Sequence, residues 1–385
     1  MNAGAAGGER PVKAVVLERP GAPIATETLM LGPPGPDEVL VRLLASGVCH
    51  SDLHLADGEW TAERPVVLGH EGCGVVEAAG PGAGQALIGR MVVLDWFTAC
   101  MACTACLNGR QWTCTGTRAL ENLLPDGTTR LRRTTGQEVL PYLGVGTFAE
   151  RAVVHVRTAV PVPERIDPAV GALIGCGVST GVGSVLKTAR VPAGSSVAVY
   201  GLGGVGLSVV MGAALAGATT IVAIDRHEAK LDLALSVGAT RGVLASADAD
   251  ETVEAVRAAA GGGADFAFEA IGLAVTIEQT IRSVRTGGTA VLVGMTPFGV
   301  QASFDAFDLV DRSISILGSN YGFTVGPLDF PRYADLHLSG RLPVDRLIDR
   351  RIDLDGVAGA FDAMRRGEGA RAVVVYGSPD PADAS

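Results

Sequence analysis

Aromatic residues and positive charge are both scarce in this sequence. Phe, Trp and Tyr make up 5% of the 385 residues, and 31 Lys and Arg stand against 41 Asp and Glu, for a net charge of −10. A protein that binds nucleic acid needs a basic stripe to replace phosphate counterions. The one basic cluster consists of Arg130, Arg132 and Arg133, which we interpret as a solvated loop. We therefore expect no nucleic-acid partner.

Long apolar runs are also missing. The stretch from Ser208 to Ala218 is short and rich in Gly and Ala, so we predict a buried helix there and no membrane-spanning segment. Met1 to Glu9 lack the apolar core of a signal peptide, and together with Ser378 to Ser385 they are predicted to be frayed tails. We expect a cytoplasmic protein with reduced cysteines, in which clustered cysteines bind metal more often than they form disulfides.

Short apolar runs separated by Gly and Pro fill the first third of the chain and predict an all-β unit. These runs are residues 12–17, 39–44, 74–78 and 91–94. From about residue 179, apolar strands such as SVAVYG and TIVAID alternate with helical patterns, which predicts a parallel sheet with right-handed crossovers. The end of the chain returns to mixed structure, with helices near 330–339 and 356–366 and an edge strand, AVVVY.

This pattern predicts an α/β protein of two domains. Residues 1–178, joined by 321–385, would form a β-rich domain, and residues 179–320 would form an inserted doubly wound domain. Hydrophobic residues make up 48% of the chain, which is enough for two cores of this size.

Four cysteines form the pattern C-x2-C-x2-C-x7-C: they are Cys100, Cys103, Cys106 and Cys114. Four thiolates from one short segment can surround a tetrahedral ion and leave no position for substrate, which indicates a structural zinc. Iron–sulfur clusters also take four cysteine ligands. The ferredoxin pattern ends with a Cys followed by Pro, however, and Thr115 follows here.

A second set of metal-binding residue types is scattered over three segments. Cys49, His50 and His54 lie in GVCHSDLH, His70 lies in GHEG, and Cys176 lies in GCG. One Cys from each of two segments with one His would give three ligands and leave a fourth position open, as a catalytic zinc requires. The remaining cysteine, Cys73, is interpreted as a small core residue.

The segment GLGGVG, with Gly201, Gly203, Gly204 and Val205, follows a predicted strand and opens a predicted helix. Asp225 ends the next strand, 19 residues after Gly206. This context is typical of a dinucleotide site, in which the pyrophosphate rests on the helix N-terminus. A carboxylate at Asp225 accepts from ribose hydroxyls and repels a 2′-phosphate, which favours NAD over NADP. Arg226 opposes that preference, and Lys230 could reach the same ribose.

Together these segments resemble the zinc-dependent medium-chain alcohol dehydrogenase family over residues 12–376. The motifs that carry the resemblance are GVCHSDLH at 47–54, GHEG at 69–72, the four-cysteine segment, GCGVSTGVG at 175–183, GLGGVG at 201–206 and Asp225. The resemblance implies a GroES-like catalytic domain and an inserted Rossmann domain. It also implies an NAD-dependent oxidoreductase with one catalytic and one structural zinc.

The resemblance assigns the catalytic zinc to Cys49, His70 and Cys176. Glu71 would be able to enter the coordination of the metal, and Asp52 would accept from the other ring nitrogen of His70. A zinc-bound alkoxide would lose its proton through Ser51, the nicotinamide ribose and His54, and hydride would pass between substrate and NAD(H).

The resemblance also implies contacts to the cofactor and the substrate. His50 would meet the pyrophosphate, and Arg371 would approach it from the returning segment. Four residues would line the nicotinamide and adenine paths: Thr180, Val205, Ile271 and Val293. Three aromatic residues would wall a pocket for a small alcohol, aldehyde or related carbonyl: Trp60, Trp96 and Tyr142. For each of these residues, packing or solvation is the alternative.

Residues 116–148 resemble the long version of this segment found in dimeric members, which favours a homodimer. They also resemble thiol-adduct formaldehyde dehydrogenases, whose substrate is hydroxymethyl-glutathione or hydroxymethyl-mycothiol. Arg118 matches one of their carboxylate-binding arginines, whereas His54 counts against that reading. A biosynthetic carbonyl or imine reductase and, more remotely, a non-catalytic nucleotide-sensing protein stay open.

Overall fold

The computed structural model describes residues 8–377, which form two compact units. The first unit takes residues up to 176 together with 325–335 and the segment from 348 onward, and the second takes 177–324 and 336–347. The sequence-based division kept all of 321–385 with the first domain. The structure gives 336–347 to the second unit because the turn Val344–Leu347 contacts helix α5 (Gly204–Ala216), a long-range contact that local pattern does not reveal. The predicted tails fall mostly outside the described residues.

The first unit contains a closed barrel and a larger mixed sheet. The barrel runs β1-β2-β7-β8-β4, and the sheet runs β10-β6-β5-β3-β18-β17, with β9 also paired to β3. The strands are β1 (Arg10–Leu17), β2 (Ile24–Leu31), β3 (Glu38–Gly47), β4 (Val66–Val67), β5 (Glu71–Ala79), β6 (Met91–Leu94), β7 (Leu131–Arg132), β8 (Glu138–Pro141), β9 (Arg151–His155), β10 (Ala159–Pro161), β17 (Ile348–Ile352) and β18 (Arg371–Val375). The helices are α1 (His50–Ala56), α2 (Thr104–Leu107), α3 (Pro168–Leu173), α10 (Gly326–Leu338) and α11 (Val357–Arg365).

Strand β1 shows how alternation builds this unit. Val12 and Val16 face the barrel core, while Val15 and Leu17 pack on the other side with residues of α1 and α11. Successive strand side chains point to opposite faces, so one strand can serve two cores. Leu53 and Leu55 of α1 pack into the second core and fix the helix in place. Helix α1 carries the predicted site residues within 50–54.

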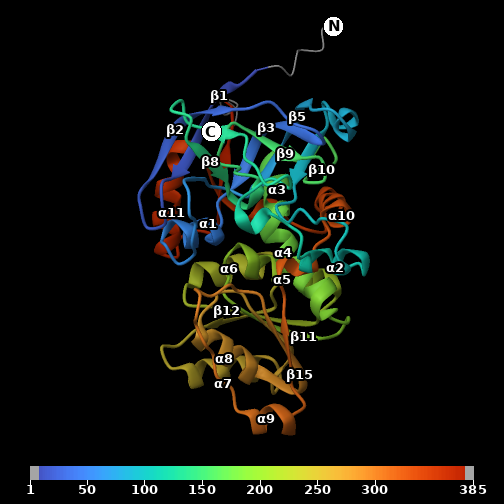
Figure 1. Ribbon diagram of the computed structural model, residues 1–385. Helices are drawn as coiled ribbons and strands as arrows, with labels where there is room; N and C mark the ends of the chain where they lie inside the picture. Colours follow the sequence, from blue (N-terminus) through green and yellow to red (C-terminus); the bar gives the residue numbers. More distant parts are fainter. Residues whose placement is uncertain (1–7, 378–385) are drawn as a thin grey trace, which may run out of the picture. The chain divides into compact units, whose positions relative to one another are not determined.

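Segments from the two ends of the chain share one sheet, as the blue and red strands of Figure 1 show. The prediction that AVVVY is an edge strand is wrong, because β18 lies between β3 and β17. Its neighbour β17 (IDRRI) is the edge strand, and its three consecutive charged residues hid it from an apolar pattern search.

The arginine cluster at 130–133 is not the solvated loop that the sequence suggested. Arg130 bonds to Glu38 and Asp126, both at 2.8 Å, and Arg133 bonds to Glu27 at 2.8 Å. Their side chains are only 20% and 21% exposed. Glu38 and Glu27 lie 92 and 106 residues away in sequence, so these two pairings depend on closure of the barrel.

One helical stretch, Pro168–Ala189, is long and apolar enough to cross a membrane by length and composition, but 94% of its apolar window is buried inside the protein. It is a core helix, capped by Asp167, whose side chain accepts from the Ala169 N–H. The stretch changes to π-helical hydrogen bonding at Ile174–Val178, and such turns occur often at functional sites. Cys176 lies in the middle of that turn.

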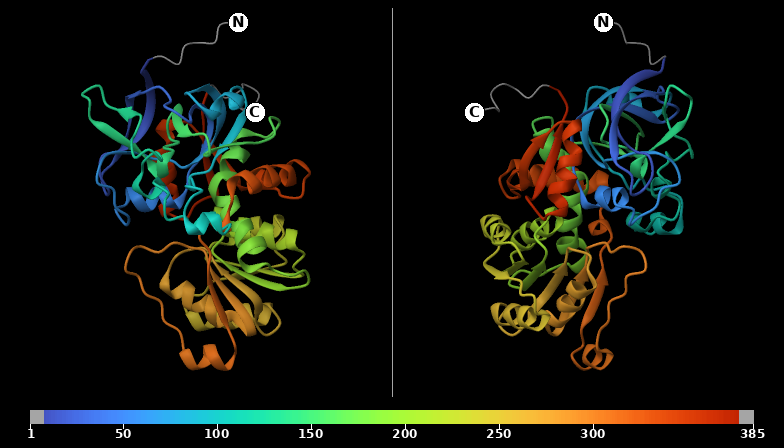
Figure 2. Two further views of the ribbon diagram at one scale, coloured as in Figure 1. Left: turned by 45° about the vertical axis from the view of Figure 1, so that its right-hand side comes forward. Right: turned by 90° about the vertical axis from the view of Figure 1, so that its left-hand side faces the viewer.

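The second unit is a six-stranded parallel sheet in the order β13-β12-β11-β14-β15-β16, with helices on both faces (Figure 2). Its strands are β11 (Ser196–Tyr200), β12 (Thr220–Asp225), β13 (Arg241–Leu244), β14 (Ala264–Glu269), β15 (Val284–Leu292) and β16 (Ser315–Gly318). Its helices are α4 (Ser179–Gly183), α5, α6 (Glu228–Ser236), α7 (Ala249–Ala259), α8 (Ala274–Ser283) and α9 (Ala306–Asp311). The predicted doubly wound fold is confirmed.

Burial on both faces explains why these strands read as apolar runs. Ala198 and Tyr200 of β11 pack with Val256 of α7 and Ile281 of α8. Helix α5 contacts β11, β12 and β14 and is apolar around its circumference, as expected of a helix that is buried over most of its length.

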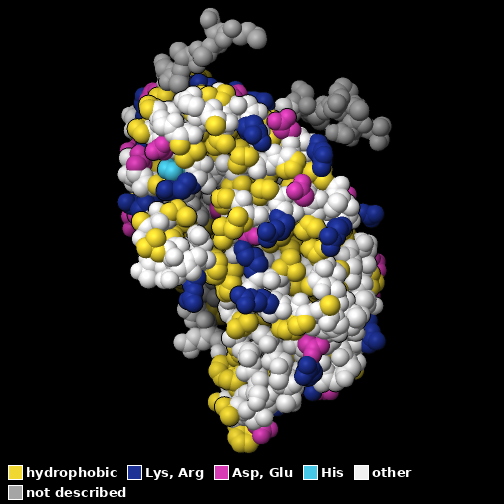
Figure 3. Space-filling view, turned by 90° about the vertical axis from the view of Figure 1, so that its right-hand side faces the viewer, with side chains coloured by type: hydrophobic (Ala, Val, Ile, Leu, Met, Phe, Trp, Pro, Cys, Tyr) yellow, Lys and Arg dark blue, Asp and Glu magenta, His cyan; other side chains and the backbone are white. Residues whose placement is uncertain are grey.

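Hydrophobic side chains are exposed at the end of the second unit that carries α9 (Figure 3). Phe298 and Phe307 are each 78% exposed, and Val310 is 76% exposed. They lie in the segment between β15 and β16, and β16 is an edge strand of the described sheet.

Candidate metal and dinucleotide sites

The four-cysteine segment closes on itself. The sulfur atoms of Cys100, Cys103, Cys106 and Cys114 all lie within 4.8 Å of one another. Backbone N–H groups point at them: Cys103 N donates to Cys100 Sγ at 3.3 Å, and Cys100 N donates to Cys114 Sγ at 3.2 Å. The short helix α2 and the turn Gln111–Thr113 bring the distant fourth cysteine back.

The chemistry of this donor set fits a cation. Hydrogen bonds from the backbone of Cys106 and Thr115 lower the pKa of Cys103 to about 5, whereas burial raises the pKa of Cys106 to about 12. Four close thiolates therefore cannot form together unless a positive charge sits among them. A structural zinc meets that need, because its ligands bind deprotonated.

A second cluster gathers Cys49, His70, Glu71 and Cys176, whose ligand atoms also lie within 4.8 Å of one another. Cys49 caps the start of α1, His70 precedes β5, and Cys176 comes from the π-helical turn. All four side chains are at most 8% exposed. Three segments that are far apart in sequence thus meet at one buried point.

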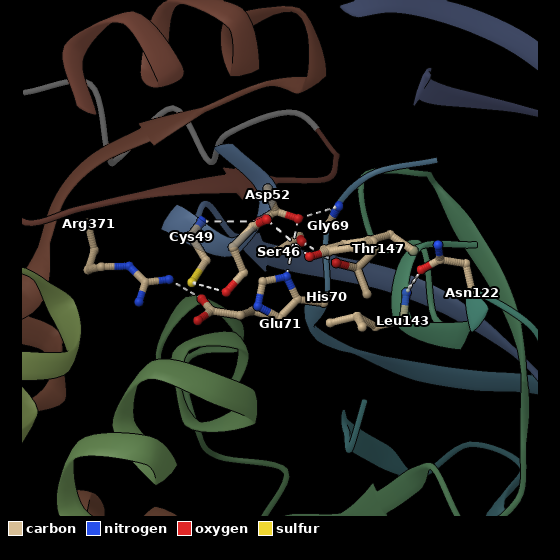
Figure 4. A network of polar contacts seen from close by, with 12 residues as sticks. Ser46, Cys49, Asp52, Gly69, His70, Glu71, Asn122, Leu143, Thr147 and Arg371 are labelled. Atoms are coloured by element: carbon tan, nitrogen blue, oxygen red, sulfur yellow. Dashed lines mark hydrogen bonds and ion pairs between the residues drawn. The ribbon is translucent and has the colours of Figure 1, made fainter. Parts of the chain in front are cut away.

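His70 provides the test of whether this cluster fits a metal. Its Nε2 atom is buried and has no hydrogen-bond partner within residues 8–377, which is costly for a polar atom unless something else binds it. Its other nitrogen, Nδ1, lies 3.2 Å from Asp52 Oδ1 (Figure 4). A carboxylate on Nδ1 fixes the tautomer that leaves Nε2 free to ligate.

Asp52 is itself held rigidly. It is fully buried, and its oxygens accept from Cys49 N at 3.2 Å and Gly69 N at 2.9 Å. The Cys176 thiol hydrogen-bonds to Cys49, which holds the pKa of Cys49 well below its usual range and raises that of Cys176. The site therefore already favours one thiolate beside His70.

Arg371 lies inside this cluster. Its guanidinium forms a buried ion pair with Glu71 (Figure 4). Burial raises the pKa of Glu71 to about 7, and the charge of Arg371 opposes that rise. The sequence suggested only a pyrophosphate contact for Arg371, which stays a prediction. The pairing with Glu71 was missed because 300 residues separate the two.

The three aromatic residues predicted to wall the substrate pocket lie in two different places. Tyr142 and Trp96 set their rings edge-on to His70, with ring centroids at 5.6 and 6.4 Å. The Tyr142 hydroxyl donates to the Ser51 carbonyl at 3.0 Å. Trp60 instead stacks on His54 at 5.0 Å. The structure therefore brings two of the three aromatic residues to His70.

Among the predicted proton-route residues, Ser51 Oγ lies 3.9 Å from Cys49 Sγ. His54 bonds through Nδ1 to Glu59 and has a partly exposed side chain. His50 is exposed, with its ring 6.1 Å from that of His54. Glu59 was missed at the sequence level because nothing distinguishes it from other surface glutamates.

The glycine-rich turn between β11 and α5 has the geometry that a phosphate requires. Gly201 has φ of 88°, and a Cβ on Gly206 would lie 1.7 Å from the Gly201 carbonyl oxygen. Gly203 is the N-cap of α5, so Gly204 and Val205 form its first turn. The backbone N–H groups of that turn are available to an anion.

Asp225 ends β12 beside this turn. Its two carboxylate oxygens accept from Leu202 N at 2.9 Å and His227 N at 3.1 Å. Arg226 is exposed and donates to the His227 ring at 3.1 Å. Lys230 lies in the first turn of α6 and is partly exposed.

Three further predicted cofactor contacts lie in the second unit. Thr180 and Val293 are buried, and Ile271 is 42% exposed. Glu269, which the sequence analysis missed, links Ile271 to Val293: its Oε1 accepts from Ile271 N and Gly272 N, and its carbonyl accepts from Val293 N. The sequence feature that could have identified Glu269 is a single Glu at the end of the apolar strand DFAFE.

Comparison with known proteins identifies the family. Residues 35–164 match the alcohol dehydrogenase GroES-like domain, and residues 204–339 match the zinc-binding dehydrogenase domain. S-(hydroxymethyl)glutathione dehydrogenase of Paracoccus denitrificans is 33% identical and covers 94% of this chain and 99% of its own. The chain belongs to the zinc-binding medium-chain alcohol dehydrogenase family and is an oxidoreductase of that family.

Two solved structures are similar over nearly the whole chain. An alcohol dehydrogenase zinc-binding domain protein of Burkholderia ambifaria has a TM-score of 0.90 at 36% identity and covers 96% of this chain and 99% of its own. A zinc-binding dehydrogenase of Sinorhizobium meliloti bound to NADP has a TM-score of 0.78 at 33% identity, with 95% and 99% covered.

Proposed function

We propose that this enzyme transfers hydride between an alcohol, or its carbonyl product, and NAD(H) at the cluster of Cys49, His70, Glu71 and Cys176. The observation that carries the proposal is the buried, unpartnered Nε2 of His70, which Asp52 orients towards two cysteines. Cys49, His70 and Cys176, with Glu71 beside them, would hold a zinc ion, which would supply Lewis acidity towards an alcohol or carbonyl oxygen.

Neighbouring side chains orient the residues of that site and balance their charge. Asp52 fixes the His70 tautomer, and Arg371 compensates the charge of Glu71. Tyr142 and Trp96 wall the space next to His70 with apolar ring edges, which exclude water. Ser51 takes the proton of the substrate hydroxyl, and His54 delivers it to solvent.

We propose two zinc ions per chain and a preference for NAD. The four-cysteine lobe holds the structural ion because all four of its donors are sulfur and no position stays open. Asp225 supports NAD because its carboxylate repels a 2′-phosphate, and the NADP-bound relative shows that members of the family can take the other cofactor.

We also propose a cytoplasmic homodimer. The exposed hydrophobic residues around α9 and the edge strand β16 support self-association, since apolar patches of this kind mark protein interfaces. Light scattering should give twice the chain mass, and Phe307→Asp should lower it. If the wild type has the mass of a monomer, the proposal of a homodimer is wrong.

A thiol-adduct formaldehyde dehydrogenase is the second candidate function. The 33% identity to an S-(hydroxymethyl)glutathione dehydrogenase favours it. Arg118, which would bind the carboxylate of the thiol, is paired with Glu121 at 2.7 Å, so a ligand has to compete for it. Arg118→Ala should abolish use of adducts and leave simple alcohols unaffected if this candidate is right.

The test is oxidation of primary, aromatic and thiol-adduct alcohols with NAD, and reduction of the matching aldehydes with NADH, by zinc-loaded protein. Cys176→Ala should lose the activity and one zinc ion. Cys73→Ala is the matched control, because Cys73 is equally buried in the same unit but lies outside both clusters. Equal activity of the two variants, or no activity of the wild type on any pair, contradicts the proposal.

A further inference from the structure

The end of helix α1 folds a carboxylate and an indole back onto His54. The chain turns after Ala56, and the backbone N–H groups of Glu59 and Trp60 both donate to the His54 carbonyl, at 2.9 and 3.2 Å. This places the Glu59 carboxylate on His54 Nδ1 and stacks the Trp60 ring on the imidazole, with ring centroids 5.0 Å apart and ring planes inclined at 28°. The imidazole is therefore fixed by two neighbours that come from one turn.

This arrangement decides which nitrogen of His54 is available. An ionised carboxylate can only accept, so Nδ1 carries the proton and Nε2 is left as the base. Within residues 8–377, a second titratable ring lies near His54: His50, whose ring centroid is 6.1 Å away. Asp52, on the same helix, is turned towards Gly69 and His70 instead.

We propose that Glu59 is a positioning residue for proton transfer: it holds His54 with Nε2 free to accept the substrate proton and stabilises the imidazolium that forms. The inference rests on the proposed function, in which Ser51 and His54 carry that proton. Glu59 has a side chain 40% exposed to solvent, against 18% for His54. Glu59 is therefore also the point at which the proton can leave to water.

The proton count balances without any electron transfer. An O–H bond on the substrate side breaks, and an N–H bond forms at Nε2. The Nδ1–H then passes its proton to the Glu59 carboxylate, which releases it to water or buffer. The Glu59 carboxylate is then ionised again. His54 regains its starting tautomer when Nε2 loses its proton to solvent while Nδ1 takes one up, so that one proton in total has left the substrate side.

The substitution Glu59→Gln separates this role from simple packing. An amide oxygen still accepts from Nδ1–H, so the ring stays in place, but the charge that stabilises imidazolium is gone. Charge-assisted hydrogen bonds are roughly twice as strong as neutral ones. We expect kcat for alcohol oxidation to fall about three- to tenfold with KM unchanged, the solvent deuterium isotope effect to rise, and added imidazole buffer to restore part of the rate.

Glu63→Gln is the matched control, since Glu63 is an exposed glutamate of the same loop. It should match the wild type in every measurement. All variants are assayed as zinc-loaded, full-length protein, and circular dichroism checks that they fold.

A double-mutant cycle distinguishes failure of this inference from failure of the proton route. If Glu59 acts through His54, Glu59→Gln should change nothing further in a His54→Gln background. A slow His54→Gln enzyme with a Glu59→Gln enzyme that equals the wild type overturns only the role of Glu59. A His54→Gln enzyme with wild-type kcat overturns the proton route and the role of Glu59 together.

Discussion

Replacing Arg371 by Met should destabilise the first unit strongly. Arg371 is 5% exposed and its partner Glu71 is fully buried. With zinc bound, the thiolates of Cys49 and Cys176 and the carboxylate of Glu71 are three negative charges in one buried site. The metal compensates two of them, and Arg371 supplies the third positive charge. Its loss leaves one uncompensated buried charge, which costs about 3–5 kcal/mol of unfolding free energy.

Urea unfolding followed by tryptophan fluorescence suits this measurement. All three tryptophans, at positions 60, 96 and 112, lie in the first unit, so their signal reports on that unit and not on the second. The wild type, Arg371→Met and the double variant Glu71→Gln/Arg371→Met are compared as zinc-loaded proteins.

The double variant gives the decisive comparison. It removes both charges, so it should recover most of the stability that Arg371→Met loses, since replacing a whole buried pair is often nearly neutral. Arg371→Met within about 1 kcal/mol of the wild type, or a double variant less stable than the single one, would refute the charge-compensation reasoning. The first outcome would mean that Glu71 takes up a proton, since burial already raises its pKa to about 7, or that water or the metal screens its charge.

Three further predictions concern other parts of the chain. Cys100→Ser should lower the zinc content from two ions to one and weaken the first unit while NADH still binds; unchanged metal content contradicts the structural site. Asp225→Ser should raise kcat/KM with NADP relative to NAD, and a wild type that uses both cofactors equally would show that Arg226 prevails. Burial raises the pKa of Glu269, so its protonation favours the folded state at low pH and that contribution is lost as pH rises through the folded pKa. The stability of Glu269→Gln relative to the wild type, from thermal unfolding by circular dichroism, should therefore increase as the pH rises above the ordinary Glu pKa of 4.5. Glu278→Gln, where hydrogen bonds from Ser303 lower the pKa, should show the opposite slope, and only below that value.

The features that sequence predicted well are those that depend on neighbours in the chain. TIVAID is β12 with the expected ends, because a strand buried on both faces reads as one apolar run. The four-cysteine lobe spans residues 100–114, so its closure needs only short local turns. The turn of Gly201 to Gly206 is equally local.

What sequence did not reveal depends on pairing between distant segments. The order that places β18 inside the sheet, and the partners that neutralise Arg130 and Arg133, both follow from how strands meet. The position of Trp60 is a different case. Its contact with His54 is local, but it depends on the path of an irregular turn after α1, which no periodic pattern encodes.

Gly47 shows how distant pairing builds the metal site. In β3 it lies opposite Glu71 of β5 on one side and Val373 of β18 on the other. A Cβ at this position would lie 1.9 Å from Glu71 Oε2 and 3.0 Å from Arg371 Nη2. The Glu71–Arg371 ion pair therefore occupies the space that a side chain at position 47 would fill. The motif GVCHSDLH shows the glycine, but only the register of three strands explains why no larger residue fits beside Cys49.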